Sequence, residues 1–193
     1  MRRFKTLLAF AIATVAFGVL TDIASARNYS YSETRFTATY FSFEWRGGVG
    51  TTRCNVTLAN QLHTRTMPKV LESLVGLITA ASVGGCSAGS ATVLGATLPW
   101  HIRYAGFGGT LPNISQIRTK IVGWQFRVRE PFGVEYLETS TASSPTTGTL
   151  DRENGGRVSD IQIGGTVETD LGVAVTHVGF SVSVTPAVTV TLI

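Results

Sequence analysis

One short segment of the sequence matches a pattern for covalent catalysis. Residues 85–89 (GCSAG) fit G-x-S-x-G, in which a serine on a tight turn attacks a carbonyl carbon. Asp160 or Asp170, followed by His177, would complete the order serine, acid, histidine found in α/β-hydrolases. That motif needs a strand before the serine and a helix after it, whereas here a helix is expected before and a strand after. We predict that Ser87 lies in a polar turn, and keep a secreted serine hydrolase using Ser87 and His177 as the alternative.

A pair of carboxylates also has a spacing that chemistry can use. Glu168 and Asp170 are two residues apart, which places both on one face of a strand and about 6.6 Å from each other. Inverting glycoside hydrolysis uses two carboxyl groups at about that separation. No aromatic residue or third acid flanks the pair, so we interpret it as a solvated strand edge.

The possible metal ligands are not spaced as known sites require. His63, His101 and His177 form no H-x-H or H-x-x-x-H pair, so only the fold could gather them. Residues 151–156 (DRENGG) offer oxygen atoms to Ca²⁺, but they lack the EF-hand spacing and are typical of a polar turn. We predict no metal and no cofactor, and a solvated or hydrogen-bonded His101.

Large aromatic side chains could bind sugar rings if several of them faced solvent together. The candidates are Trp45, Trp100 and Trp124, with Tyr29 and Tyr31 near the expected mature N-terminus. In antiparallel β proteins most such side chains belong to the core, because each buries about 150–250 Å². Core packing is our expectation, and a carbohydrate-active β-sandwich is the alternative.

The N-terminus has the pattern of a cleavable export signal. Residues 1–5 are cationic, residues 6–20 form an uncharged apolar run, and residues 24–26 (ASA) are the small residues that a signal peptidase recognises. At about 1.5 Å per helical residue the run spans roughly 23 Å, less than the roughly 30 Å of a bilayer core. We predict cleavage after residue 26, a mature chain that begins at Arg27, and no transmembrane anchor after cleavage.

Export also determines how the two cysteines are interpreted. An even cysteine count in an oxidising compartment favours a disulfide over free thiols or metal ligands. Cys54 and Cys86 are therefore predicted to be bonded to each other. In the chain-entropy model such a bond stabilises by about 3–4 kcal/mol.

Charge argues against nucleic acid as a partner. The formal net charge of the 193-residue chain is +4. Removal of residues 1–26 takes away three basic residues and one acid, which leaves +2 on the mature chain. The basic residues that remain are scattered among acids, whereas phosphate binding needs a clustered basic face.

Hydrophobic periodicity predicts strands and one helix in the first half of the mature chain. Residues 34–45 and 53–58 alternate on either side of a glycine-rich break, which indicates a hairpin with Cys54 pointing inward. From residue 68 to 83 the apolar residues recur at three- and four-residue steps, which is typical of an amphipathic helix. The disulfide would then join the end of this helix to the second strand.

The second half of the mature chain is strand-like throughout. The segments with this character are 91–97, 98–104, 115–128, 134–138, 161–168, 172–180 and 181–192. Residues 139–149, rich in Ser and Thr, predict a flexible loop. We predict a single domain over 27–193, an antiparallel β-sandwich or partly open barrel with the helix of residues 68–83 packed on it.

Two segments carry a resemblance to other proteins. Residues 98–101 (LPWH) and 109–114 (GTLPNI) lie in a stretch, 98–121, that resembles exported bacterial proteins of similar length and layout with no assigned function. The resemblance covers most of the mature chain loosely and this stretch best. It implies a bacterial, extracytoplasmic setting and supplies no catalytic residue.

These observations together favour a secreted or cell-envelope protein that acts without catalysis, by binding or by structural assembly through a β surface. Its ligand would be a protein or a carbohydrate whose identity the sequence does not give. The secreted hydrolase and the carbohydrate-active protein are the competing classes. A further class, an outer-membrane β-barrel, needs an even set of roughly ten-residue strands with apolar lipid faces. The expected helix, the disulfide and the terminal residues 191–193 (TLI) argue against it.

Overall fold

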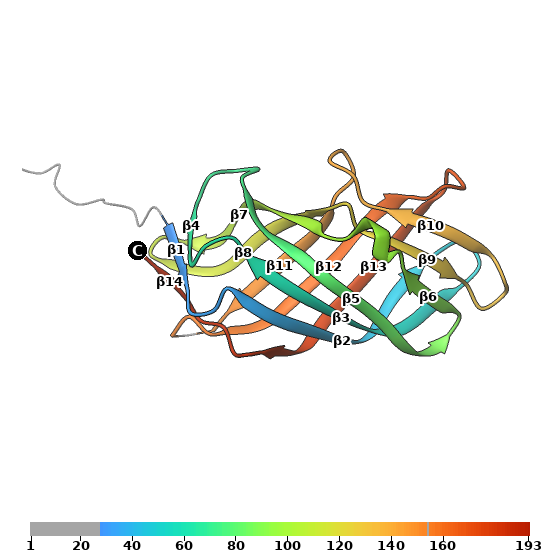
Figure 1. The fold of residues 1–193 in the computed structure, drawn as a ribbon, viewed down its shortest axis with the longest axis horizontal. Coiled ribbons are helices and arrows are strands. Elements are labelled where there is room, and N and C mark those ends of the chain that lie inside the picture. Colours follow the sequence, from blue (N-terminus) through green and yellow to red (C-terminus); the bar gives the residue numbers. More distant parts are fainter. Residues whose placement is uncertain (1–27, 154) are drawn as a thin grey trace, which may run out of the picture.

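The structure is a computed structural model that describes residues 28–153 and 155–193, so the expected signal peptide and Arg27 lie outside the described residues. Antiparallel β-strands make up most of the described chain, as predicted (Figure 1). A 3-10 turn over Gly95–Thr97 interrupts them. The strands are β1 (Asn28–Tyr31), β2 (Arg35–Arg46), β3 (Thr51–Leu62), β4 (Thr66–Pro68), β5 (Leu74–Ala88), β6 (Ser90–Val93), β7 (Trp100–Thr110), β8 (Asn113–Val122), β9 (Gln125–Arg129), β10 (Glu135–Thr139), β11 (Thr146–Arg152), β12 (Val158–Glu168), β13 (Ala174–Thr185) and β14 (Val190–Leu192).

Eight of the strands close into a barrel in the order β11-β12-β13-β2-β3-β5-β7-β8. The predicted hairpin is confirmed, since β2 and β3 pair from Arg46↔Thr51 to Arg35↔Gln61. Phe36 and Tyr40 point inward by simple alternation. A bulge between Tyr40 and Phe43 then shifts the phase by one residue, so Phe43 also faces the interior.

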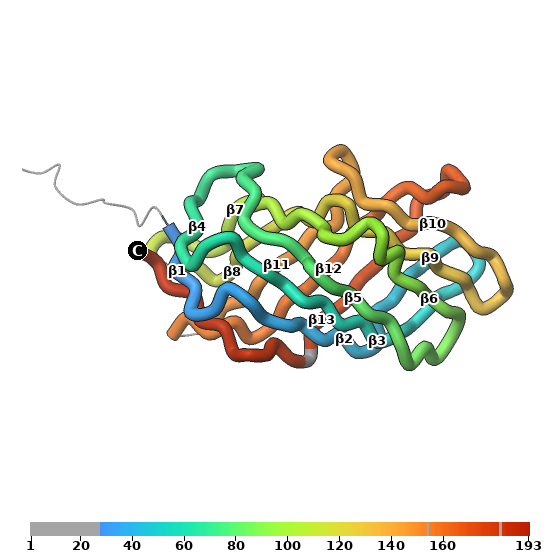
Figure 2. The backbone as a smooth tube through the Cα atoms, in the orientation of Figure 1, coloured from blue at the N-terminus to red at the C-terminus, as the bar shows by residue number. Residues whose placement is uncertain are grey.

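Two small sheets close the ends of the barrel. The sheet β14-β1-β4 lies at the end that carries the C-terminus, and the sheet β10-β9-β6 lies at the opposite end (Figures 1 and 2). Each sheet places apolar side chains in the core, including Tyr29 and Val190 from the first and Phe126 and Tyr136 from the second. Both mouths of the barrel are therefore filled by side chains.

The interior leaves little free space. One cavity of about 30 Å³ lies among Tyr31, Phe36, Tyr40 and Ile161. That volume corresponds to about one water molecule, whereas small-molecule sites measure about 300–1,000 Å³.

The predicted helix over residues 68–83 is wrong. In its place the chain ends β4 at Pro68, turns, and enters β5 at Leu74. Two of the apolar residues that suggested the helix, Val70 and Leu71, lie in the turn and are 59% and 65% exposed. The disulfide was expected to hold the end of this helix. In the structure, Cys86 lies near the end of strand β5.

A β-bulge explains why this segment resembled a helix. The register of β5 against β3 shifts between Ala80 and Ile78, which leaves Thr79 as an extra residue. The inward residues Ile78 and Ala81 are consequently three positions apart instead of two. Pairing with β3 decides the conformation, and a spacing of three is what an amphipathic helix would also show.

Two further boundaries differ from the predictions. The expected strand 115–128 is two strands, β8 and β9, separated at Gly123, whose φ of 90° favours glycine. The expected loop 139–149 is shorter, because Thr146–Arg152 forms β11 between β8 and β12. Threonine is common in β-strands, so a Ser/Thr-rich composition alone could not distinguish the strand from the loop.

Candidate functional site

The structure does not assemble a catalytic triad around Ser87. Ser87 is exposed near the end of β5, whereas His177 is fully buried on β13, and β2 and β3 lie between these two strands in the barrel. Within the described residues no hydrogen bond joins them. Asp160 accepts a hydrogen bond from Ser181 (2.8 Å), and Asp170 accepts one from the backbone N–H of Leu137 (2.7 Å). In the part of the chain that the structure describes, His177 and both aspartates therefore have partners other than Ser87.

His177 has a different partner, which sequence reasoning missed. Its Nδ1 is in close contact with Oε1 of Glu138, and both side chains are completely buried. The other carboxylate oxygen, Oε2, accepts a hydrogen bond of 2.6 Å from the indole N–H of Trp45. Glu138 belongs to β10, so this contact ties the end sheet to the wall of the barrel. No local motif could have revealed it, because strand order alone brings the residues together.

The three tryptophans lie in the core around this pair. Trp45, Trp100 and Trp124 are all fully buried, and the centroids of Trp100 and Trp124 are 5.1 Å apart. The ring of Trp124 lies nearly parallel to the imidazole of His177, at 5.5 Å. Tyr29 is also fully buried, with its hydroxyl 3.2 Å from that of Tyr104. None of these three tryptophans presents a ring to solvent for a sugar to stack on.

The predicted carboxylate pair lies in a surface cleft of about 550 Å³. Glu168 and Asp170 share this cleft with hydroxyl side chains such as Thr141 and Ser144. Several of these groups are already engaged, since Asp170 binds the backbone of Leu137 and Ser144 donates to the carbonyl of residue 166. No aromatic side chain lines the cleft.

The histidines do not converge. His63 and His101 are exposed, His101 as expected for the polar face of its strand, and only His177 is buried. Asp151 accepts a hydrogen bond from Gln162 (2.8 Å), and part of the predicted turn 151–156 is strand. Over residues 28–153 and 155–193, no group of three or more His, Cys, Asp or Glu side chains is arranged to hold a metal ion.

The disulfide between Cys54 and Cys86 is confirmed, and it fastens the end of β5 to β3. Cys54 is buried, as predicted, and Cys86 is exposed. Asn55, next to the disulfide, has its amide nitrogen against Gly85, where any Cβ would lie 2.8 Å away. Gly85 has a φ of +57° and belongs to the irregular pairing between Gly84 and Ala88.

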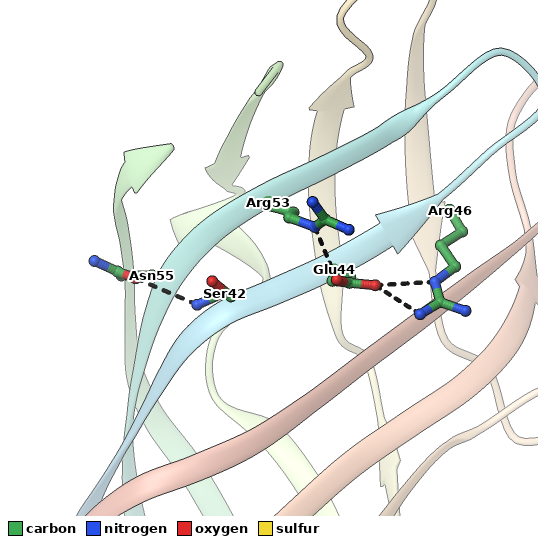
Figure 3. A network of polar contacts seen from close by, with 5 residues as sticks. All are labelled: Ser42, Glu44, Arg46, Arg53 and Asn55. Carbon is green, nitrogen blue, oxygen red and sulfur yellow. Dashed lines mark hydrogen bonds and ion pairs between the residues drawn. The ribbon is translucent and has the colours of Figure 1, made fainter. Parts of the chain in front are cut away.

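Polar contacts fix the outer face of β2 and β3 beside this disulfide (Figure 3). Glu44 lies between Arg46 and Arg53 and accepts hydrogen bonds from both, at 2.7 and 2.8 Å. The hydrogen bond from Arg46 is the largest of the contacts that hold the pKa of Glu44 below its ordinary value of 4.5. Asn55 accepts a bond from the N–H of Ser42 (3.4 Å). Two of these contacts, from Arg53 to Glu44 and from Ser42 to Asn55, join β2 to β3, the strand with which β5 pairs.

The most unusual exterior feature is the second half of β5. The β5–β7 ladder that closes the barrel has four pairs and ends at Ile78↔Trp100. Beyond it, β5 continues to Ala88 with β3 on one side (Figure 1). Among the described residues, no strand and no backbone hydrogen bond occupies the other edge from Ala80 to Gly84. We call residues 80–84 the free edge.

The free edge lacks the usual protection against pairing with another chain. Charged residues and prolines commonly block such edges, but β5 contains neither from Leu74 to Ala88. Ala80, Ser82 and Gly84 are exposed, while Ala81 and Val83 pack partly against the core. The exposed side chains along this edge are short.

None of the family models, curated proteins or solved structures compared with the chain matches it. Within the described ranges, no helical segment has the length and hydropathy needed to span a bilayer.

Proposed function

We propose that this protein is exported to the bacterial cell envelope or beyond, and that it acts there by binding or structural assembly without catalysis. The free edge of β5, residues 80–84, is the element through which it binds. A partner contributes an extended segment, which adds to the barrel wall as a further strand.

The observation that carries this proposal is the absence of a ladder partner on the free edge in the described structure. A barrel normally leaves no strand edge, because every strand has two neighbours. Here an edge of five residues has no ladder partner in the described structure, and Ala80, Ser82 and Gly84 along it are exposed. Backbone hydrogen bonds supply the affinity in strand addition, so such an edge needs no deep pocket.

The exported location is supported by two features. The first 26 residues have the pattern of a signal peptide. The disulfide is of the kind that persists in oxidising compartments.

The hydrolase alternative has no supporting contact. A nucleophilic serine needs a base within about 2.6–3.2 Å and preorganised donors for the oxyanion. Ser87 is exposed, and His177 is buried against Glu138. Replacement of Ser87 by Ala is therefore expected to change neither stability nor function, and a fluorophosphonate probe should not label the protein at Ser87. Labelling that the Ala variant abolishes would overturn the non-catalytic proposal.

The binding role can be tested with one charge on the free edge. Ser82→Lys places an ammonium group beside the unpaired backbone, which should prevent strand addition. Thr39→Lys is the matched control, because Thr39 lies on the outer face of β2, a strand with neighbours on both sides. We expect the native mass of the exported protein in envelope extracts to fall to that of the monomer for Ser82→Lys only. A native mass that is monomeric in the unmodified protein, or unchanged by Ser82→Lys, would contradict the proposal.

A further inference from the structure

We infer that this protein also docks on a phospholipid bilayer, through hairpin tips at the end of the barrel that carries the sheet β10-β9-β6. The tips are residues 47–50 between β2 and β3, residues 131–134 between β9 and β10, and residues 169–173 between β12 and β13 (Figure 1). We call them the apolar tips. They share no residue with the free edge, so the inference goes beyond the proposed function.

Large apolar side chains on the apolar tips face solvent. Phe132, on the second tip, is 81% exposed, more than any other large apolar side chain among the described residues. Val49 and Val134 on the first two tips, and Leu171 and Val173 on the third, are between 39% and 54% exposed. Exposed apolar side chains that gather at one place mark sites of protein or membrane interaction.

Buried and surface carboxylates hold the apolar tips in position. Glu130 is buried, and its Oε2 accepts a hydrogen bond of 3.0 Å from the backbone N–H of Val49, which fixes the first tip to the second. The Asp170 carboxylate accepts the backbone N–H of Leu137, which fixes the third tip to β10. The apolar side chains are therefore presented together on ordered turns.

The backbone and charge of the tips also suit an apolar medium, in which an unpaired polar group is costly. Each tip is closed by a backbone hydrogen bond, from Gly47 to Gly50, from Gly133 to Glu130 and from Gly172 to Thr169. Residues 47–50 and 131–134 carry no charge, whereas the third tip contains Asp170. We therefore expect the first two tips to enter the bilayer and the third to rest at its surface.

Charge behind the first two tips favours phospholipid as the occupant. Arg46 and Arg129 lie at the bases of these tips and are exposed. Glu44 is shared between Arg46 and Arg53, and no carboxylate among the described residues pairs with Arg129. Guanidinium groups bind phosphate oxygens well. Apolar tips with arginines behind them match a bilayer surface, where hydrocarbon lies beneath phosphate headgroups.

The turn between β4 and β5, towards the opposite end of the barrel, exposes apolar side chains without this arrangement. Val70 and Leu71 are 59% and 65% exposed. However, Lys69 and Glu72 flank them, and Glu72 pairs with Lys120. Entry of this turn into lipid would take charges out of water, which is costly. Leu71 therefore provides a matched control of high exposure.

A fluorophore at position 132 tests the docking directly. Phe132→Cys and Leu71→Cys each place one free thiol in the mature protein, because the native cysteines are bonded to each other. The thiol is labelled with the nitrobenzoxadiazole fluorophore, and vesicles of phosphatidylcholine and phosphatidylglycerol are added. We expect a blue shift and brighter emission from the label at position 132, and neither from the label at position 71. No response at position 132, or equal responses at both positions, would overturn the inference.

Flotation with the same vesicles measures the affinity. Phe132→Ser should weaken binding about tenfold, since transfer of one phenylalanine side chain from water accounts for about that factor. Leu71→Ser should bind as the unmodified protein does. Near-ultraviolet circular dichroism checks that both variants are folded, which their exposure leads us to expect. Binding that Phe132→Ser leaves unchanged, or that Leu71→Ser weakens equally, would contradict docking through the apolar tips.

Arg129→Gln tests the choice of phospholipid. This variant should bind the mixed vesicles more weakly, and the loss should be smaller on phosphatidylcholine alone, because only phosphatidylglycerol carries a net negative headgroup. Unchanged binding of the mixed vesicles by Arg129→Gln would refute the headgroup contact and, with it, a bilayer as the occupant of the tips.

Discussion

At the scale of single residues, the least expected feature is the buried contact of Glu138 with His177 and Trp45. A carboxylate inside an apolar core is tolerated only when its oxygens are paired, because removal of a charge from water costs several kcal/mol. Here one oxygen contacts the imidazole and the other accepts the indole N–H. The residues come from β2, β10 and β13, so the contact joins three separate parts of the chain.

Replacement of Glu138 by Gln should destabilise the fold by about 2 kcal/mol, because it changes the buried side chain that contacts His177 and accepts the indole N–H of Trp45. Urea unfolding followed by tryptophan fluorescence measures the change. Glu135→Gln is the matched control on the same strand, where the carboxylate and its partner Arg127 are both largely exposed. We expect close to no change for that control. Equal effects of the two substitutions would show that the buried pair has no special role.

The tyrosines make a prediction about alkaline pH. Tyr29, Tyr31, Tyr40, Tyr104 and Tyr136 are all buried, and desolvation is the main cause that raises the pKa of each above the ordinary value of 10.0. Above about pH 10 the unfolded chain loses these protons while the folded chain keeps them. The unfolded state then binds fewer protons, so the free energy of unfolding falls as pH rises.

The measurement is a titration of tyrosinate absorbance near 295 nm, with near-ultraviolet circular dichroism as the monitor of folding. Absorbance should rise only when the fold is lost, well above the ordinary pKa. A rise centred near pH 10 while the circular dichroism is unchanged would contradict the burial of these five side chains.

At the scale of elements, β-bulges shape the strands that matter most. The bulge after Tyr40 turns Phe43 inward, where its ring covers Gly179. A Cβ at Gly179 would lie 2.2 Å from that ring, so only glycine fits there. The bulge at Thr79 and the irregularity at Gly85 limit the stretch of β5 that pairs regularly with β3.

The disulfide should protect the second half of β5 more than any other strand. This half has a ladder partner on one side only, and the bond between Cys54 and Cys86 holds its far end. In the Cys54→Ala, Cys86→Ala double variant we expect a loss of about 3–4 kcal/mol of stability. Hydrogen exchange should accelerate over residues 80–88 before it does in β2.

Exchange of the unmodified protein with and without reductant provides the control, because it leaves the sequence unchanged. Acceleration spread evenly over all strands would show that the bond acts on the whole fold and has no local effect on β5.

At the scale of the whole molecule, both barrel ends are closed by sheets and the interior is filled. The outside offers a strand edge at which the wall can be extended, and this agrees with a role in assembly.

Processing of the whole chain remains a prediction, because residues 1–27 lie outside the described residues. We expect the exported protein to begin at Arg27, since residues 24–26 supply the small side chains of a cleavage site. N-terminal sequencing of exported material checks this. A product that keeps residues 1–20 and stays in the membrane fraction would show that the segment is an anchor.

The sequence by itself determined the features that depend on local pattern. Alternation in 34–45 and 53–58 identified the first hairpin, and the cysteine count with the export signal identified the disulfide. Burial of the three tryptophans also followed from their size and apolarity.

Two kinds of feature were decided only by the tertiary structure. One is the choice between helix and strand where the apolar spacing fits both, and the other is which residues of distant strands come into contact. The bulge at Thr79 gave β5 the spacing of a helix, and pairing with β3 decided in favour of a strand. Strand order brought Glu138 to His177 and kept His177 from Ser87. The free edge of β5 follows from where β7 begins, at Trp100, and an unpaired backbone has no signature in the side chains of its own strand.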